Sequence, residues 1–316
     1  MSTVEPTLAA LPKPLPRYFL ATRPAFLSVT FVACLIGLAA AFADGLPLRA
    51  STALASVVFA LVAHAGVNVL NDYYDALNGT DALNIERLFP FTGGSRFIQN
   101  GVLSLRETAI FGLVLFALVM AAGLWLMRVS GLGLFWIGAL GLLVGWAYSA
   151  PPLKLNSRGL GEFGVLLGFL LIVAGTDYVQ RGGFSEYPLA AGLPFALLVT
   201  GLLYINQFPD RRADEAAGKH TVVVRWGAQR AVYGYWLLAA LAYGWLAAAV
   251  GLGLLPLVAL IALAPAKFSL SAAQDLRRYA AEPKRLAPAI QATILAAIAH
   301  GILLAAALAL HQGKIL

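Results

Sequence analysis

About nine long apolar stretches run through this chain of 316 residues and limit what it can fold into. A helix needs roughly 17–25 apolar residues to cross about 30 Å of hydrocarbon. Lipid offers no hydrogen-bond partners, so the backbone there must satisfy its own polar groups as a helix. Only 12% of the residues are charged, against roughly 25% in soluble domains. The sequence therefore predicts an all-α integral membrane protein with about nine transmembrane helices. They are expected near residues 25–43, 52–72, 108–127, 131–149, 162–180, 188–208, 231–250, 252–270 and 288–309.

Basic residues fall mostly on one side of this arrangement. Of the 22 Lys and Arg residues, all but Arg49, Arg128, Arg181 and Lys314 would face the same side. Because Lys and Arg accumulate in cytoplasmic loops, we predict a multi-pass protein of the cell (inner) membrane with a cytoplasmic N-terminus. Residues 1–22 contain several prolines and no pattern typical of a cleaved signal. They are expected to be a cytoplasmic lead-in to a single multi-span domain, residues 23–316.

Polar side chains gather at the end of the second apolar stretch. Asn68, Asn71, Asp72 and Asp75 lie close together, and Asp81 follows beyond the expected end of the helix. Positions four apart share a helix face, so Asn68 aligns with Asp72 and Asn71 with Asp75. An ionised Asp in the bilayer costs on the order of 2.5–3.5 kcal/mol, so such residues usually handle a cation or a charged ligand. This segment, residues 68–81, is the first Asp-rich motif.

A second Asp-rich motif, residues 206–219, ends the sixth apolar stretch. Asn206, Asp210 and Asp214 are spaced four apart and form one polar stripe on a helix. Both motifs end even-numbered stretches, so both would face the cytoplasm. Two facing acidic stripes suit Mg²⁺, which prefers oxygen ligands and is typically held by one or two carboxylates plus substrate phosphates. The sequence therefore predicts an Mg²⁺ site that binds a diphosphate.

The two motifs and the loop between them resemble the UbiA superfamily of intramembrane prenyltransferases. Residues 71–81, NDYYDALNGTD, are similar to the family's first motif, and residues 206–219, NQFPDRRADEAAGK, to its second. Residues 148–154, YSAPPLK, resemble the loop between them. Within the superfamily the chain is most similar to the menaquinone branch, the 1,4-dihydroxy-2-naphthoate polyprenyltransferases. The third Asp of the first motif, Asp81, stands six residues after Asp75 as in that branch.

The resemblance implies helices around a central cavity that is open to lipid. It implies Mg²⁺-dependent transfer of a polyprenyl group from polyprenyl diphosphate to an aromatic acceptor, most closely 1,4-dihydroxy-2-naphthoate, with release of diphosphate and CO₂. The expected Mg²⁺ ligands are Asp72, Asp75, Asp210, Asp214, Asn68, Asn71, Asn206 and Asp81. Asp81 could instead orient the acceptor or hold the loop. The expected diphosphate contacts are Lys154, Arg96, Lys219, Arg158, Arg23 and Tyr148. Lys154 and the four aspartates Asp72, Asp75, Asp210 and Asp214 are the expected catalytic residues.

The acceptor is the least constrained part of this prediction. Asp177 stands where the menaquinone branch leads us to expect a neutral residue, and we interpret it as a polar residue that faces the cavity. Residues 91–96 differ from the form of that loop. Relatives of the same architecture serve 4-hydroxybenzoate, homogentisate, a haem vinyl group or a chlorophyllide carboxylate. No residue is predicted to bind the acceptor.

The sequence is also compatible with two other classes of protein. Carboxylates in the membrane and an internal repeat also mark cation-coupled transporters, although those place charges near the midplane. A non-catalytic scaffold of the same fold would tolerate loss of Asp72 or Asp210. The basic residues are scattered between the apolar stretches, so nucleic-acid binding is not expected. We expect the protein to be surrounded by membrane lipid, and no feature of the sequence predicts a protein partner.

Overall fold

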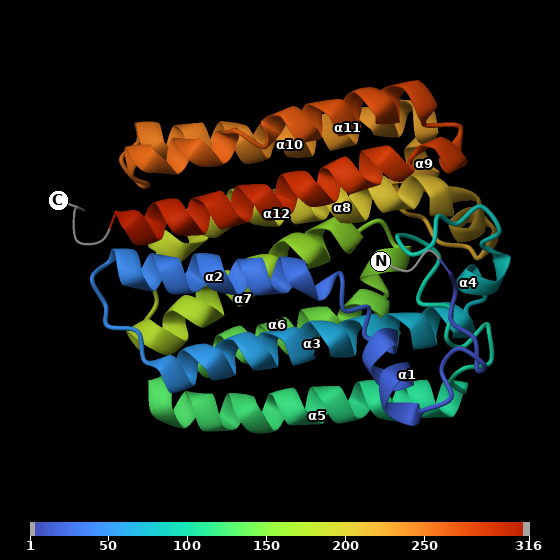
Figure 1. Ribbon diagram of the computed structural model, residues 1–316, viewed down its shortest axis with the longest axis horizontal. Coiled ribbons are helices and arrows are strands. Elements are labelled where there is room, and N and C mark those ends of the chain that lie inside the picture. Colours follow the sequence, from blue (N-terminus) through green and yellow to red (C-terminus); the bar gives the residue numbers. More distant parts are fainter. Residues whose placement is uncertain (1–3, 312–316) are drawn as a thin grey trace.

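Residues 4–311 form a bundle of helices in the computed structural model of the protein (Figure 1). Lys314 and the first three residues of the predicted lead-in lie outside the described residues. All regular structure within residues 4–311 is helical, as predicted. The α-helices are α1 (Pro14–Ala21), α2 (Leu27–Ala43), α3 (Ala50–Leu77), α4 (Thr80–Leu83), α5 (Leu105–Ser130), α6 (Leu134–Ser149), α7 (Gly161–Arg181), α8 (Tyr187–Ala216), α9 (Val222–Trp226), α10 (Ala228–Gly251), α11 (Ala266–Tyr279) and α12 (Ala287–Leu310). Three short 3₁₀ helices are η1 (Leu155–Ser157), η2 (Leu257–Leu263) and η3 (Pro283–Arg285).

The predicted apolar stretches can be compared with the observed helices one by one. Within residues 4–311, 7 helical segments are long and apolar enough to cross a membrane. The first and fourth predicted stretches correspond to α2 and α6, which are shorter at 17 and 16 residues. A multi-pass membrane protein is therefore confirmed. The number nine depends on counting α2 and α6 as spans, and it stays a prediction.

The eighth predicted stretch, residues 252–270, was misplaced. The chain turns after Leu252, and the apolar segment runs from Leu257 to Tyr279 through η2 and α11. Lys267 therefore lies inside this helical segment and not in a loop. Its ammonium lies 5.0 Å from the centre of the Phe268 ring. The long aliphatic stem lets such a lysine lie against apolar surface.

Helix α8 is the centre of the bundle. In its most apolar part 83% of the residues are buried inside the protein, against 22% for α5. Helices α2, α7, α10 and α12 pack around α8, whereas α5 lies at one edge and packs mainly on α3 (Figure 1). The second Asp-rich motif therefore ends the most enclosed helix of the protein.

The two ends of the bundle differ. The short helices α4 and α9 lie at the end where α3 and α8 finish, and the α2–α3 connection lies at the opposite end (Figure 1). The first end also carries the N-terminal segment. Glu5 accepts hydrogen bonds from Arg87 at 2.7 Å and from Asn100 at 3.1 Å. The predicted lead-in is thus attached to the loop that joins α4 to α5.

Close packing of α2 on α7 depends on Gly37. A Cβ at this position would lie 2.4 Å from the backbone oxygen of Val173 and 3.0 Å from Cβ of Thr176. Small residues of this kind let membrane helices approach closely. Because the nearest atom belongs to the backbone of α7, it has little room to move away.

Gly37→Ala should destabilise the protein by about 1–3 kcal/mol, the usual cost of overpacking. Thermal unfolding in detergent measures this as a lower melting temperature. Gly244→Ala is the matched control, since a Cβ there meets no atom within 4 Å. An unchanged melting temperature for Gly37→Ala would show that α2 and α7 are not packed this closely.

Candidate functional site

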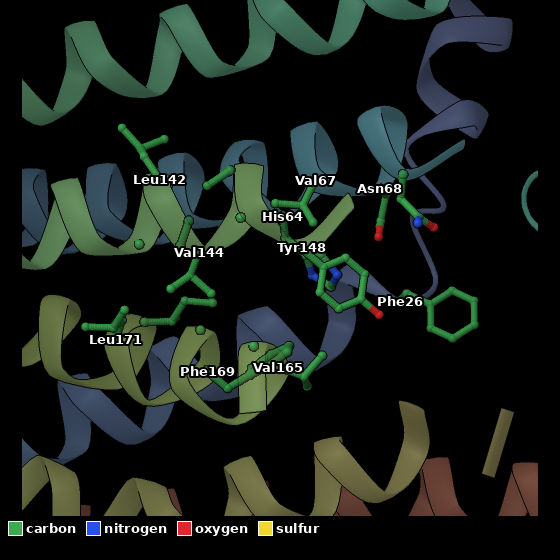
Figure 2. A pocket seen from close by; sticks show the side chains of 18 of the residues that line it. Phe26, His64, Val67, Asn68, Leu142, Val144, Tyr148, Val165, Phe169 and Leu171 are labelled. Carbon is green, nitrogen blue, oxygen red and sulfur yellow. The ribbon is translucent and has the colours of Figure 1, made fainter. Parts of the chain in front are cut away.

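A cavity of about 780 Å³ runs through one side of the bundle. Helices α2, α3, α5, α6, α7 and α8 contribute to its walls. Figure 2 shows Asn68 and Tyr148 near one end and the apolar side chains of Val144, Phe169 and Leu171 farther along. His64 lies between these parts, with Nδ1 2.7 Å from Thr30 Oγ1 and its ring edge-on to Phe169. The cavity therefore joins a polar end to a long apolar interior.

The first Asp-rich motif forms one wall of the polar end. Asn71 donates to Asp75 at 3.2 Å and to Ser149 of α6 at 3.0 Å. Asn68 donates to the backbone oxygen of Thr22 at 3.0 Å. Asn68, Asn71 and Asp75 line the cavity, and the helical spacing of Asn71 with Asp75 agrees with this shared face. Asp72 is different, because it is turned away from the cavity lining.

Asp72 forms an ion pair with Arg23. It also accepts a hydrogen bond from the backbone N–H of Ser95 at 3.3 Å. Burial opposes the charge of Arg23, but the carboxylates of Asp72, Asp81 and Asp75 keep its pKa above the usual value. Arg23 itself lines the cavity. Arg23 therefore lies beside the first motif, in a position that suits its predicted contact with the diphosphate.

A tight turn carries the chain from α3 to Asp81. Gly79 has φ +82°, the left-handed region that favours glycine. Asn78 accepts from the N–H of Thr80 at 2.9 Å and donates to Asp75 at 3.2 Å. Beyond this turn Asp81 is buried and lines the cavity.

Asp81 is also attached to the loop after α4. Gln99 donates to its carboxylate at 3.3 Å, and Arg96 donates to its backbone oxygen. Burial, together with the charges of Asp75 and Asp72, raises the pKa of Asp81 to about 8. These contacts favour the alternative that Asp81 holds the loop.

The second motif faces the first across the cavity. Asn206, Asp210 and Asp214 line it from α8. Lys219 joins the two motifs, because its ammonium lies 2.7 Å from Asp75 and 3.6 Å from Asp214. Burial opposes the charge of Lys219, but the two carboxylates keep its pKa above the usual value. The prediction that both motifs meet at one site agrees with this geometry.

Three of the predicted cations lie elsewhere. Lys154 and Arg158 are exposed and do not line the cavity, because the Pro151-Pro152 turn and η1 carry this loop outward. Arg96 is buried but points toward Asp81 and Glu5, and it does not line the cavity either. The direct diphosphate contacts predicted for these three residues stay predictions, since none of the three side chains lines the cavity in this arrangement of the chain. Tyr148 lines the cavity, and its predicted contact with the diphosphate stays a prediction.

Several polar residues of the site were missed in the sequence. Asn84 donates to Asp210 at 2.5 Å, and Gln207 donates to Glu162 at 2.7 Å. Asn156, and not Lys154, is the residue of the α6–α7 loop that lines the cavity. Asn84 directly follows α4 and Asn156 lies in the short 3₁₀ helix η1, so no longer periodic pattern identifies them. Gln207 follows directly after Asn206 and could have been noticed for that reason.

Asp177 does not face the cavity, although a cavity-facing position was expected. It is buried near the opposite end of α7 and accepts two hydrogen bonds from Arg181, at 2.8 and 2.9 Å. Arg181 also pairs with Asp44 at 2.6 Å. The neighbouring Thr176 lines the cavity in place of Asp177.

The donor atoms at the polar end fit a magnesium ion in their chemistry. Within residues 4–311 no three His, Cys, Asp or Glu side chains converge as a preformed metal site. Instead the carboxylates are paired with Arg23, Lys219 and Asn84. The side-chain oxygens of Asn84, Asn206 and Gln207 are buried and have no hydrogen-bond partner. Because Mg²⁺ needs only one or two carboxylates and takes the rest of its shell from water and phosphate, this all-oxygen donor set is compatible with it.

The fold and the site define a multi-pass membrane protein with a carboxylate-rich pocket at the end of an apolar cavity. Residues 30–295 match the UbiA prenyltransferase family. The chain belongs to this family, and the resemblance seen in the two motifs is confirmed.

Individual relatives agree with the family. The chain is 29% identical over 212 residues to the 1,4-dihydroxy-2-naphthoate octaprenyltransferase of Escherichia coli, covering 65% of this chain and 67% of that protein. It is 28% identical over 268 residues to the protein of the same name from Mycobacterium tuberculosis, covering 82% and 86%. The alignment covers 67% of the length of the Escherichia coli protein, and it covers 66% and 60% of the length of two other curated relatives.

Solved structures show the same fold. A UbiA homologue from Archaeoglobus fulgidus, bound to DMAPP and Mg²⁺, superposes with a TM-score of 0.63. The match covers 92% of this chain and 99% of that one, at 16% sequence identity. At this identity the likeness concerns the fold alone.

Lys219→Gln should destabilise the protein, because it leaves Asp75 and Asp214 buried without their cation. Breaking a buried ion pair in this way costs about 3–5 kcal/mol. Thermal unfolding of the purified variant in detergent, without added divalent cation, measures the loss. Lys267→Gln is the control, since Lys267 is exposed and has no carboxylate within ion-pair distance in the described chain. Equal melting temperatures for both variants would show that Lys219 does not join the two motifs.

Proposed function

We propose that this protein transfers a polyprenyl group from polyprenyl diphosphate to an aromatic acceptor, in a reaction that depends on Mg²⁺. The observation that supports this most is the charge at the polar end of the cavity. Four carboxylates, Asp72, Asp75, Asp210 and Asp214, stand against the two cavity-lining cations Arg23 and Lys219, and Asp81 adds a fifth carboxyl group with a raised pKa. A diphosphate anion would be repelled from such a site unless further cations enter with it.

Mg²⁺ would remove this repulsion. The residues placed to hold it are Asp75, Asp210 and Asp214, with the unpartnered oxygen of Asn206 beside them. When bound, Mg²⁺ would supply charge neutralisation for the diphosphate as it departs. Asp72 would support the site by orienting Arg23, and Asp81 by holding the loop.

The protein's own cations complete the diphosphate site. Lys219 and Arg23 are already held at the edge of the cavity by carboxylates, so their orientation is fixed before the donor arrives. Each can share its hydrogen bonds with a phosphate oxygen, and charge-assisted bonds of this kind are the strong ones. Lys219 contacts Asp75 of the first motif and Asp214 of the second. The diphosphate group of the donor would therefore lie between α3 and α8.

The apolar interior suits the other half of the donor. As the C–O bond of the allylic diphosphate breaks, its electron pair leaves with the diphosphate and the allylic carbon becomes cationic. Apolar walls from α6 and α7 keep water away from this carbon. The ring of Tyr148, which lines the cavity near Asn68, can stabilise the positive charge through its face.

The most suitable acceptor is 1,4-dihydroxy-2-naphthoate. The relatives from Escherichia coli and Mycobacterium tuberculosis carry the name of an octaprenyltransferase for this compound. The new C–C bond would form at the carboxyl-bearing ring carbon, and loss of CO₂ would restore the aromatic ring. The same chemistry on 4-hydroxybenzoate is the alternative. Family membership favours both over a cation-coupled transporter.

We further propose nine membrane spans, with α2 and α6 as the two short ones, and a cytoplasmic site. The two Asp-rich motifs lie at the end of the bundle that carries α4, α9 and the N-terminal segment (Figure 1). The excess of Lys and Arg predicted for that side supports its cytoplasmic orientation. Selective labelling of a single cysteine introduced near Gly218 in intact and opened cells distinguishes the two sides.

Asp72→Asn and Asp210→Asn should each lower the rate of transfer by about 10²–10³-fold, the range seen when one preorganised charge interaction is removed from an active site. The amide keeps the shape of the side chain while removing its charge. Product formation is measured by mass spectrometry with purified protein, Mg²⁺, prenyl diphosphate and acceptor.

Asp275→Asn is the matched control, because Asp275 lies on α11 away from the cavity. All three variants should elute as the wild type does on size exclusion. Near-wild-type turnover of either motif variant would remove its aspartate from the active site.

With 1,4-dihydroxy-2-naphthoate and 4-hydroxybenzoate in competition, we expect a prenylated, decarboxylated naphthoquinol as the main product. Chelation of Mg²⁺ should abolish product formation, because the carboxylates then repel the donor. Added Mg²⁺ should restore product formation. A product that retains the carboxylate would refute the decarboxylation step. Prenylated hydroxybenzoate as the main product would refute the acceptor, and turnover under chelation would refute the metal dependence.

A further inference from the structure

The loop that joins α4 to α5 contacts both Asp-rich motifs. We call this loop, residues 84–103, the cover loop. Asn84 at its start donates to Asp210 of the second motif at 2.5 Å. The backbone N–H of Ser95 donates to Asp72 of the first motif at 3.3 Å. The cover loop therefore bridges the two motifs at the polar end of the cavity.

The middle of the cover loop forms part of the cavity wall. Its cavity-lining residues there are Phe91, Thr92, Gly93 and Gly94. Gly93 and Gly94 have φ of +78° and +75°, in the left-handed region that favours glycine. A Cβ on Gly94 would lie 2.4 Å from a carboxyl oxygen of Asp81, so the backbone of the loop lies directly against this side chain. The path of the cover loop therefore determines where the carboxyl groups beside it can lie.

One carboxylate from the N-terminal segment holds the two halves of the cover loop together. Glu5 accepts hydrogen bonds from Arg87 in the first half at 2.7 Å and from Asn100 in the second half at 3.1 Å. The guanidinium of Arg96, also in the second half, lies 3.7 Å from the same carboxylate. Burial opposes the charge of Glu5, but hydrogen bonds from Asn100 and Arg87 keep its pKa below the usual value. Glu5 is therefore charged at neutral pH and contacts both halves of the loop.

One path leads from Glu5 to the second motif. Arg87, which Glu5 holds, also donates to the backbone oxygen of Asn84 at 2.6 Å. Asn84 is 2% exposed and donates to Asp210. A shift of Arg87 would therefore change the orientation of Asn84 and, with it, that of a proposed Mg²⁺ ligand.

A second path leads from Glu5 to the first motif. Arg96 donates to the backbone oxygen of Asp81 and contacts Glu5 with the same guanidinium. Burial and the neighbouring charge of Arg87 hold the pKa of Arg96 below its usual value. The two guanidinium groups therefore repel each other, and Glu5 is the carboxylate that both contact. Without the charge of Glu5, this repulsion would push the two halves of the cover loop apart.

The segment that carries Glu5 is itself held in place. Leu11 packs against a buried cluster that includes Ala21 of α1 and Phe97 of the cover loop. Arg17 of α1 donates to the backbone oxygens of Leu11 at 2.6 Å and Pro12 at 2.9 Å. Glu5 therefore contacts the cover loop from a segment that α1 fixes.

We propose that Glu5 is a positioning residue for Mg²⁺ binding, because it holds the cover loop in the conformation that orients Asp210 and Asp81. Glu5 does not line the cavity, so it acts through Arg87 and Arg96. The proposal rests on the proposed function in one respect, that the polar end of the cavity binds Mg²⁺. Residues that orient metal ligands typically contribute about 10–100-fold to metal affinity or activity.

Glu5→Gln tests this role, because the amide keeps the size of the side chain and removes its charge. We expect the Mg²⁺ concentration that gives half-maximal turnover to rise about tenfold, at the lower end of the range for such residues. At saturating Mg²⁺, kcat should stay close to that of the wild type, because Glu5 lies outside the cavity. An unchanged Mg²⁺ requirement, with or without a lower kcat, would overturn the proposal.

Glu186→Gln is the matched control, because Glu186 is exposed at the start of α8, at the opposite end of the bundle (Figure 1). It should leave the Mg²⁺ requirement unchanged. Arg87→Gln, alone and combined with Glu5→Gln, tests the path through Arg87. Effects of residues in contact are not additive, so the double variant should need less Mg²⁺ than the two single effects multiplied together predict. A fully multiplicative effect would contradict the proposal that Glu5 acts through Arg87.

A second measurement does not depend on turnover. Hydrogen–deuterium exchange, followed by mass spectrometry, reports local opening of the backbone. It is measured for the wild type and for Glu5→Gln, with and without Mg²⁺ and inorganic diphosphate. We expect faster exchange of residues 84–103 in the variant and unchanged exchange of α12.

Equal exchange of the cover loop in both proteins would overturn the proposal even if the enzyme is active. Exchange that does not respond to Mg²⁺ and diphosphate in either protein, together with a faster cover loop in the variant, has a different meaning. It would refute the proposed function and keep Glu5 as the residue that holds the loop.

Discussion

The contact of Lys219 with both Asp75 and Asp214 is the interaction on which the site depends. It joins the end of α3 to the segment that follows α8, and so brings together two motifs far apart in the chain. Carboxylates buried at a membrane protein's edge are costly unless cations accompany them. Lys219 and Arg23 are two cations against the four carboxylates of Asp72, Asp75, Asp210 and Asp214, so they offset only part of the negative charge. The site therefore has fewer cations than carboxylates, and the Mg²⁺ ions of the proposed function would supply the missing positive charge.

Local periodicity predicted which residues share a helix face, but the packing of the helices determines which of these faces lines the cavity. The spacing of Asn71 with Asp75 and of Asn206 with Asp210 and Asp214 placed these residues on stripes, and the structure has them lining the cavity. The same spacing put Asp72 beside Asn68. A helix face is broader than a cavity wall, however, and the rotation of α3 turns Asp72 toward Arg23. The sequence of residues 68–81 alone does not determine that Asp72 is oriented toward Arg23.

Loops and turns account for most of what the sequence did not reveal. The family resemblance and their positive charge led us to expect Lys154 and Arg158 near the diphosphate, but the path of the loop carries them outward. The partner of Asp210 is Asn84, which is 126 residues away. Hydropathy located the apolar stretch after α10 but not its start, because an average over many residues cannot place the turn before Leu257. In each of these cases the position of the residue depends on the three-dimensional path of the chain, which the residue types alone do not reveal.

The two ends of the bundle show why only one of them suits a ligand. At the far end Asp177 accepts two hydrogen bonds from Arg181, and the same guanidinium pairs with Asp44. These charges satisfy one another inside the protein, and none of the three residues lines the cavity. At the other end carboxyl groups outnumber the cavity-lining cations, and the oxygens of Asn84, Asn206 and Gln207 remain without partners. A closed ion-pair cluster stabilises helix packing, whereas the incomplete one beside the apolar cavity is the place where we propose that Mg²⁺ and a prenyl diphosphate bind.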